Sequence, residues 1–212
     1  MMAGSHNTAR IIGVIGASGS GKSRWLKGTL AKGDPAKLLI WDPLNEYDHG
    51  RIVTDLRELV ETLAALEPAD PFKLTYRPGP DMATYSKKFE AFCALAFEVP
   101  DVCCVIEELA DVTSPSYAPP AWSRLSRQGR HKGMTIFAAS QRPTLMDKTF
   151  LGNCTMIHCS RLNDENDVKT MSRYLGVSQE QVRAMVADKA AGRFDFIERD
   201  MQTGKTVAGH LT

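Results

Sequence analysis

The sequence predicts an α/β fold in which a mainly parallel sheet is covered by helices. Short apolar runs alternate with longer segments of helical periodicity, as they do when parallel strands are joined by helical crossovers. The apolar runs end at Gly, Pro, Asp or Ser, which is typical of buried strands. With 212 residues, 43% hydrophobic and 24% charged, the chain has the size and composition of one folded unit. We expect a flexible N-terminus over residues 1–9 and a single domain over residues 10–212.

Six apolar runs are predicted as strands. They cover residues 10–15, 38–41, 72–76, 102–106, 134–139 and 155–159. The segments between them with helical spacing cover residues 54–66, 85–97, 122–130 and 165–174. At the start of the first of these helices, Asp55 and Glu58 are placed to form a capping box.

The pattern changes after Gly176. A short helix is predicted over residues 179–187, followed by two runs, 192–198 and 206–210, around a Thr203-Gly204 turn. These two runs predict a β-hairpin at the edge of the sheet. Earlier in the chain, residues 113–122 contain three prolines, so this stretch is predicted to be an exposed loop without helix.

Cysteine usage, hydropathy and charge exclude several classes of protein. The five cysteines form no CxxC pair and mostly lie in apolar runs, which indicates buried, reduced thiols rather than disulfides or a zinc site. No apolar stretch approaches the roughly 20 residues of a membrane helix, and the N-terminus lacks a signal-peptide core. We therefore expect a cytoplasmic protein with no transmembrane segment of its own. The net charge of +1 means that any nucleic-acid contact must come from a local basic patch.

A phosphate-binding loop follows the first predicted strand. The segment GASGSGKS matches G-x₄-G-K-[ST] between the strand IIGVI and the helical stretch SRWLKGTL, the context that the P-loop (Walker A) motif requires. Its residues are Gly16, Ala17, Ser18, Gly19, Ser20, Gly21, Lys22 and Ser23. Backbone N–H groups of such a loop bind phosphate oxygens at a helix N-terminus. We expect ATP and Mg²⁺ as cofactors, with Lys22 on the β- and γ-phosphates and Ser23 on the metal.

Two glutamates and a glutamine end neighbouring predicted strands. The apolar run VCCVI leads into Glu107 and Glu108, and the run at 134–139 leads into Ser140 and Gln141. In open α/β folds, ligands bind at the carboxyl ends of the strands. Glu107 is expected to hold Mg²⁺, Glu108 to deprotonate the attacking water, and Gln141 to contact the γ-phosphate or that water. A second carboxylate favours hydrolysis over phosphoryl transfer to a small acceptor.

Several segments together resemble the FtsK/HerA superfamily of DNA-pumping ATPases. They are GASGSGKS, LLIWDPLNEY with Asp42 and Glu46, CCVIEE, SRLSRQGRHKGMTIFAASQRP and RLNDENDVKTMSRYLG, covering about residues 10–190. The resemblance implies a RecA-like fold of the ASCE P-loop NTPases and a homo-oligomeric ring, commonly a hexamer, with ATP sites at subunit boundaries. Arg130 matches the family's arginine position, so it is expected to act as an arginine finger in a neighbour's site, with Arg127 as the fallback. Glu107 stands where the family usually has Asp, which leaves open whether it or Glu108 is the base.

A chain of this length has room for the motor domain alone. In this it resembles the genome-packaging ATPases of membrane-containing viruses and phages. That resemblance implies an ATP-hydrolysing DNA translocase acting on double-stranded DNA, with capsid-vertex or viral membrane proteins as partners, in the host cytosol or associated with the virion. The strandedness of the DNA, the ring size and the direction of transport stay open.

DNA contact is expected near the loop at residues 113–122 and the basic helix that follows it. Arg124 and Lys132 are the candidate phosphate contacts, which would make binding salt-sensitive and independent of sequence. Tyr117 and Trp122 have two alternatives, stacking on bases or packing into the domain.

Two other functions remain possible from the sequence. The P-loop also resembles those of nucleoside and nucleotide kinases, although no arginine-rich lid segment follows Gln141. The second alternative is a nucleotide-gated assembly protein of the kind that filamentous phages use for extrusion, but such proteins usually carry a membrane anchor. An ABC-type ATPase is disfavoured because the chain has no LSGGQ-like segment.

Overall fold

The computed structural model describes residues 9–212. The predicted flexible N-terminus therefore lies almost entirely outside the described residues. In the described part the strands are β1 (Ile11–Ile15), β2 (Lys37–Trp41), β3 (Arg51–Val53), β4 (Phe72–Tyr76), β5 (Cys103–Ile106), β6 (Thr135–Ser140), β7 (Met156–Ser160), β8 (Ala187–Asp188), β9 (Arg193–Asp200) and β10 (Thr206–Leu211). The helices are α1 (Lys22–Gly33), α2 (Leu56–Ala64), α3 (Met82–Glu98), α4 (Pro120–Gln128), α5 (Lys148–Asn153), α6 (Glu165–Leu175) and α7 (Gln179–Arg183), with short 3₁₀ turns η1 (Leu109–Asp111) and η2 (Gly129–Lys132).

One sheet runs through the described residues in the order β10-β9-β7-β1-β6-β5-β2-β4-β3, with β8 paired to β9. The strands from β7 to β3 are parallel to one another. The C-terminal strands β9 and β10 are antiparallel and extend the sheet beyond β7. This arrangement confirms the predicted α/β class and the predicted hairpin at the sheet edge.

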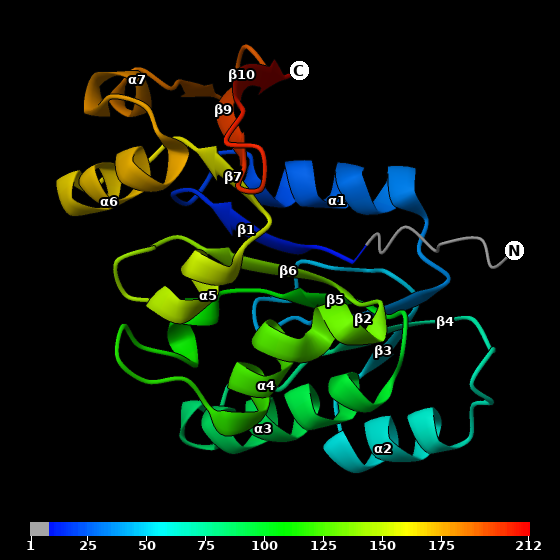
Figure 1. Ribbon diagram of the computed structural model, residues 1–212. Helices are drawn as coiled ribbons and strands as arrows, with labels where there is room; N and C mark the ends of the chain where they lie inside the picture. The colour runs from blue at the N-terminus through cyan, green and yellow to red at the C-terminus, as the bar shows by residue number, and fades with distance from the viewer. Residues whose placement is uncertain (1–8) are drawn as a thin grey trace, which may run out of the picture.

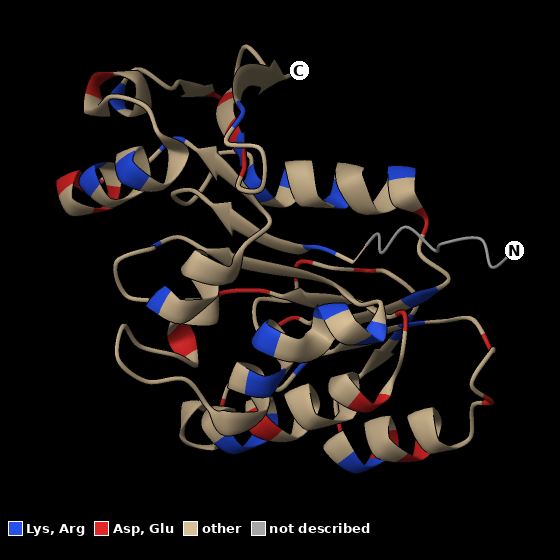
Figure 2. Ribbon diagram, viewed as in Figure 1, with Lys and Arg blue, Asp and Glu red and all other residues tan. Residues whose placement is uncertain are grey.

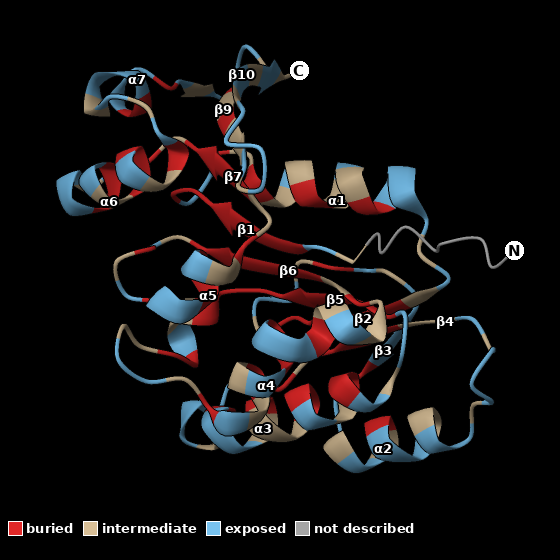
Figure 3. Cartoon of the chain, viewed as in Figure 1, coloured by how far each residue is buried: buried red, intermediate tan, exposed pale blue. Residues whose placement is uncertain are grey.

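Helices cover both faces of the sheet, with α1 on one side and α3 and α4 on the other (Figure 1). The central strands are buried throughout, whereas the helices are buried only where they face the sheet (Figure 3). On the α1 side, Leu26 and Leu30 pack against Val14 and Ile40. On the other side, Trp41 forms the centre of an aromatic cluster. Its ring centroid lies 5.9 Å from Tyr85, 5.1 Å from Phe89 and 5.6 Å from Phe92.

All five cysteines are free and buried, which confirms the prediction of buried, reduced thiols. Burial raises the pKa of the Cys103 thiol to about 12, so this group stays neutral at ordinary pH. None of the described helices combines the length and the apolar character needed to cross a bilayer.

The six strands predicted from apolar runs are all present, with ends that shift by one residue at most. Two interior elements were not predicted, β3 and α5. Strand β3 has three residues, and only Val53 among them is buried. In α5 the whole helix is six residues long and depends on Asp147, whose side chain accepts from the Thr149 N–H at 2.8 Å. Both segments are too short to show periodicity.

The proline-rich stretch was predicted without helix, and this is wrong for its last residues. Helix α4 begins at Pro120, with Pro119 at the N-cap position. Proline is tolerated in the first helical turn because its missing N–H would have no partner there. The helix also ends earlier than predicted, at Gln128, and residues Gly129–Lys132 continue as the 3₁₀ turn η2.

Two further expectations need correction. Helix α7 ends at Arg183 instead of continuing to 187, because Ala187 and Asp188 pair with β9 as the short strand β8. Asp55 caps α2 by accepting from the Glu58 N–H at 3.2 Å, but the capping box is incomplete. The Glu58 carboxylate instead accepts from Arg51 at 2.5 Å.

Candidate functional site

The topology brings the predicted site residues to one edge of the sheet. Strands β1, β6 and β5 are parallel neighbours, so the segments that follow them lie side by side. These segments are the P-loop after β1, the glutamate pair after β5 and the Gln141 loop after β6. The P-loop is anchored to its neighbours, since the Gly16 N–H donates to the Ser140 carbonyl at 3.2 Å and the Ala17 N–H donates to the Arg161 carbonyl at 2.9 Å.

The P-loop opens onto a pocket of about 380 Å³. Its lining consists of Ser18, Gly19, Gly21, Lys22, Ser23, Arg24, Glu46, Gln141, Lys189 and Phe194. Gly21 is the N-cap of α1 with φ of 95°, a conformation that L-residues rarely adopt. A Cβ there would also lie 2.8 Å from that of Phe194. The loop can therefore bend into α1 and keep the helix N-terminus open toward the pocket.

Ser23, the predicted metal ligand, is held by an acid from the segment after β2. Its hydroxyl donates to Glu46 Oε2 at 2.6 Å. The position of Glu46 is fixed by the fully buried Asp42, whose carboxylate accepts from the Glu46 N–H at 2.9 Å and the Tyr47 N–H at 3.1 Å. The Asp42–Glu46 segment thus places a carboxylate beside the Ser23 hydroxyl.

Glu107 lies at the end of β5 and is 2% exposed. The Tyr47 hydroxyl donates to its carboxylate. Burial raises the pKa of Glu107 to about 7, although the Tyr47 hydrogen bond and the charge of Lys22 act in the opposite direction. A positive charge in the site would favour the ionised carboxylate further.

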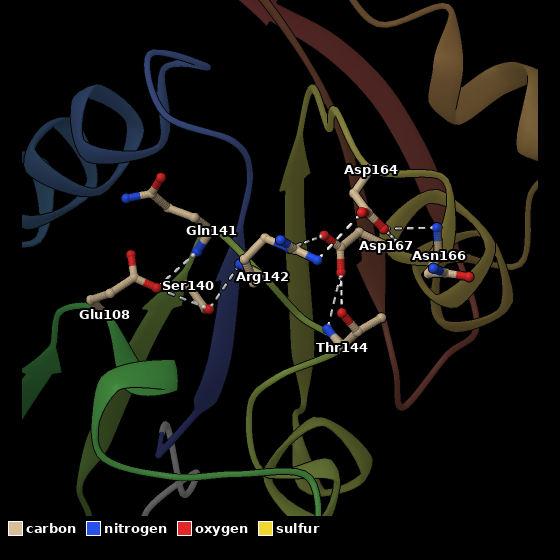
Figure 4. Close-up of polar contacts among 8 residues, drawn as sticks. All are labelled: Glu108, Ser140, Gln141, Arg142, Thr144, Asp164, Asn166 and Asp167. Atoms are coloured by element: carbon tan, nitrogen blue, oxygen red, sulfur yellow. Dashed lines mark hydrogen bonds and ion pairs between the residues drawn. The ribbon is translucent and has the colours of Figure 1, made fainter.

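Glu108 has a strained backbone, and one of its two carboxylate oxygens has no hydrogen-bond partner among the described residues. Its φ of 46° and ψ of 62° are left-handed, a conformation that costs a non-glycine residue about 1–3 kcal/mol and is common at functional sites. Oε1 accepts from the Ser140 hydroxyl at 3.2 Å and the Gln141 N–H at 3.1 Å (Figure 4). Oε2 is buried and has no hydrogen-bond partner among the described residues. A buried oxygen of this kind can accept a proton from a bound water.

The loop after β6 is fixed to helix α6 through Arg142. Its N–H donates to the Ser140 hydroxyl at 3.1 Å, and its guanidinium contacts Asp167 at 2.8 Å and Asp164 at 3.3 Å (Figure 4). Asp167 is 1% exposed and also accepts from the Thr144 N–H and hydroxyl at 3.1 and 2.6 Å. The position of Gln141 is therefore set by bonds on both sides of the loop.

The candidate basic residues lie away from this pocket. Helix α4 and η2 lead into the start of β6, whereas Gln141 follows its end. Arg130, in η2, is half-buried, and Arg127 is exposed on α4. Arg130 therefore lies at the opposite end of β6 from the P-loop edge.

The two predicted DNA contacts meet at the end of α3. Arg124 and Lys132 lie over the Phe97 ring at 4.0 and 4.3 Å, and both approach the exposed Glu98 carboxylate, at 3.8 and 3.6 Å. Figure 2 shows that α3 carries acidic as well as basic residues. Trp122 is fully buried, which excludes base stacking, whereas Tyr117 is 57% exposed.

The donors in this pocket suit a magnesium nucleotide. Among the described residues, no group of three or more His, Cys, Asp or Glu is arranged to hold a metal ion. Mg²⁺ in nucleotide sites does not need such a cage, because phosphates and water supply most of its ligands. The Ser23 hydroxyl with Glu46 and Glu107 provides hard oxygen atoms. Lys22 and the loop N–H groups provide the phosphate contacts.

Several residues of this site have no role predicted from the sequence, among them Glu46, Tyr47, Lys189 and Phe194. Glu46 is part of a segment that signals the resemblance, but its contact with Ser23 cannot be read from the chain. Tyr47 ends the same segment, whereas Lys189 and Phe194 belong to no motif. Only the folded chain brings Tyr47 to Glu107, and Lys189 and Phe194 to the P-loop.

No family model matches the chain. Among curated proteins, "Protein P9" of Pseudoalteromonas phage PM2 is 32% identical over 181 residues, which cover 81% of this chain and 78% of P9. Among solved structures, the genome-packaging NTPase B204 of Sulfolobus turreted icosahedral virus 2 in complex with ATP-gammaS aligns with a TM-score of 0.70 at 15% identity, over 94% of this chain and 96% of B204. VirB4 of Thermoanaerobacter pseudethanolicus aligns with a TM-score of 0.68 at 12% identity, over 100% and 91% of the two chains. The chain therefore has the RecA-like P-loop NTPase fold.

Proposed function

Since the chain belongs to the same family as protein P9 of Pseudoalteromonas phage PM2 and shares the fold of a viral genome-packaging NTPase, we propose that it is an ATPase that drives DNA into a capsid. The observation that carries the hydrolytic part is the free, buried Oε2 of Glu108 beside the Gln141 loop. A carboxylate in this position activates water.

In the proposed reaction, a water molecule attacks the γ-phosphorus of ATP while the bond from that phosphorus to the β–γ bridging oxygen breaks. Glu108 takes the proton of the water, and ADP and phosphate leave. Lys22 binds the β- and γ-phosphates, and Gln141 orients the water or the γ-phosphate. Ser23 and Glu107 would hold Mg²⁺, with Glu46 positioning the Ser23 hydroxyl. When bound there, the metal would supply positive charge to the phosphates.

The second part of the proposal is that hydrolysis is coupled to DNA movement. As part of it, we propose that the chain is a member of the FtsK/HerA superfamily. The coupling is supported by the position of Arg130 beyond the far end of β6, from which it would serve the site of another subunit. We propose a homo-oligomeric ring, in the commonest case a hexamer, that moves double-stranded DNA. Arg124 and Lys132 are proposed to contact DNA phosphates, and capsid-vertex or viral membrane proteins to anchor the ring, in the host cytosol or on the virion.

The proposal is tested by the ATPase rate per subunit as a function of protein concentration, with and without double-stranded DNA. A ring motor gives a rate that rises with concentration, because sites form between subunits. DNA should stimulate it, and stimulation should decrease with salt as phosphate contacts weaken. Lys22→Ala is the control and should show neither effect.

Turnover independent of both protein concentration and DNA would contradict the packaging motor. Transfer of the γ-phosphate to a nucleoside or nucleotide would identify the kinase instead. A wild type that binds ATP without hydrolysing it would favour the assembly protein.

A further inference from the structure

A lysine from the C-terminal part of the chain lies directly over the P-loop. An ideal Cβ placed on Gly19 would lie 3.1 Å from Lys189 Cε and 3.3 Å from Lys189 Nζ. Gly19 has φ of 70°, a left-handed conformation that glycine adopts without strain, and it lines the pocket. The ammonium group of Lys189 therefore lines the same pocket as Lys22 and Ser23.

The turn that carries Lys189 has a defined structure. It connects β8 to β9, which pair at Ala187 with Phe194 and at Asp188 with Arg193. The Asp188 side chain accepts from the N–H groups of Ala190 and Ala191 at 2.9 and 3.0 Å. These bonds hold the turn in one conformation, so Lys189 is presented by a built structure rather than by a free loop.

The same hairpin is attached to the start of α1. The Phe194 side chain packs against Gly21, and the Arg24 guanidinium lies over the Phe194 ring at 5.5 Å. Arg24 also donates to the Thr212 carbonyl at 2.6 Å. These contacts set the position of the β8–β9 turn relative to the phosphate cradle.

Lys189 is exposed and makes no hydrogen bond or ion pair with any residue that the structure describes. Glu46 lines the same pocket, but no ion pair joins it to Lys189. The Lys189 ammonium therefore lies over the anion-binding loop without a salt-bridge partner among the described residues, and a bound polyphosphate would supply one.

We propose that Lys189 is a phosphate ligand of the nucleotide bound to the P-loop of its own chain. Its ammonium binds the β- or γ-phosphate from the side opposite the loop N–H groups and stabilises the charge that develops there during hydrolysis. This deepens the proposed function and rests on it. The site then has three cations from two chains, Lys22 and Lys189 in cis and Arg130 in trans.

Phosphate contact by Lys189 is tested with Lys189→Met, which keeps the aliphatic chain and removes the charge. We expect the affinity for a non-hydrolysable ATP analogue, or kcat, to fall roughly tenfold or more, as for the loss of a charged hydrogen bond to a phosphate. Lys189→Arg should restore most of the loss. AMP, which lacks the β- and γ-phosphates, should bind both proteins equally. The melting temperature without nucleotide should stay unchanged, because Lys189 has no partner in the folded chain.

The matched control is Lys205→Met, in the exposed turn before β10, which should behave as wild type. Equal nucleotide affinity and kcat for Lys189→Met and Lys205→Met would overturn the inference while leaving the proposed function intact. A wild type without DNA stimulation would refute the packaging motor but not the phosphate contact. A wild type that binds no nucleotide would refute both.

Discussion

At the scale of single residues, the two adjacent glutamates after β5 have different surroundings and hence different chemistry. Glu107 accepts a hydrogen bond from the Tyr47 hydroxyl, and the nearby charge of Lys22 acts to lower its pKa. Glu108 directs one oxygen to the β6 loop and leaves the other without a partner among the described residues. The left-handed backbone of Glu108 turns its side chain toward β6, which explains how neighbours in sequence reach separate positions.

If Glu108 is the base that deprotonates the attacking water, Glu108→Gln should lose hydrolysis and keep ATP binding. The amide keeps the size of the side chain but cannot take a proton from water, so kcat should fall by a factor of ~10²–10⁴. Binding of ATP, measured by equilibrium titration, should be retained. Glu61→Gln, which changes an exposed acid on α2, should leave both quantities unchanged. If Glu107→Gln removes hydrolysis and Glu108→Gln does not, the two roles are reversed.

At the scale of elements, His158 joins α1, β7 and β9 behind the P-loop. Its ring stacks on Trp25 of α1 at 4.1 Å, and its Nδ1 lies 2.9 Å from Glu198 Oε1 of β9. Its Nε2 lies 3.1 Å from the Ser160 hydroxyl, within β7 itself. Burial lowers the pKa of His158 below 6.5, and the nearby Glu198 opposes this shift only in part. The neutral imidazole is thus part of the packing that supports the loop.

This predicts a loss of stability in mild acid. Because the pKa of His158 is lower in the folded than in the unfolded chain, the unfolded chain binds the extra proton. The stability that neutral His158 contributes is present above pH 6.5 and is lost as pH falls through the folded-state pKa. His158→Asn, which cannot titrate, should be less stable overall and show a smaller loss between about pH 7.5 and 5.5 in denaturant unfolding. The exposed His131→Asn should keep the wild-type loss. A wild-type loss in His158→Asn would assign the effect to other groups.

At the scale of the whole molecule, the sheet separates the phosphate pocket from the basic end of α4 and η2. A chain with this arrangement presents its own nucleotide at one edge and Arg130 at the other. In the proposed head-to-tail ring these two edges would meet. Heterologous contacts of this kind close into a ring when the rotation between subunits closes.

Mixing two inactive variants tests whether Arg130 acts in trans. Glu108→Gln keeps the arginine and lacks the base, whereas Arg130→Ala keeps the base and should lose a factor of ~10³ or more in kcat. In an equal mixture, about one interface in four pairs an intact base with an intact arginine, so up to about a quarter of the wild-type ATPase rate should return.

A mixture of Lys22→Ala with Glu108→Gln provides the control and should stay inactive. Each variant lacks a group in its own site, and an arginine from a neighbour cannot replace that group. If Arg130→Ala alone is as active as wild type, and Arg127→Ala takes its place in the mixing assay, Arg127 is the finger. If neither Arg130→Ala nor Arg127→Ala recovers activity when mixed with Glu108→Gln, the result contradicts an arginine supplied between subunits.

The features that the sequence predicts by itself are those that depend on residues close together in the chain. Apolar runs report burial of a strand, and the spacing of glycines with Lys22 and Ser23 reports a phosphate loop, because each depends on neighbouring residues only. The strand ends that carry Glu107, Glu108 and Gln141 followed from the same signals. The proline-rich start of α4 was misjudged because prolines both break helices and begin them.

Only the tertiary structure decided which distant groups meet at that loop. Tyr47 reaches Glu107, Glu46 reaches Ser23 and Lys189 reaches Gly19. Each of these contacts joins segments that follow different strands, so the strand order and pairing register set the distance between them. Periodicity along the chain reports whether a side chain is buried, but it does not report which strand lies beside which. The phosphate loop was therefore readable from the sequence, whereas the groups that surround it depend on the order of strands in the sheet.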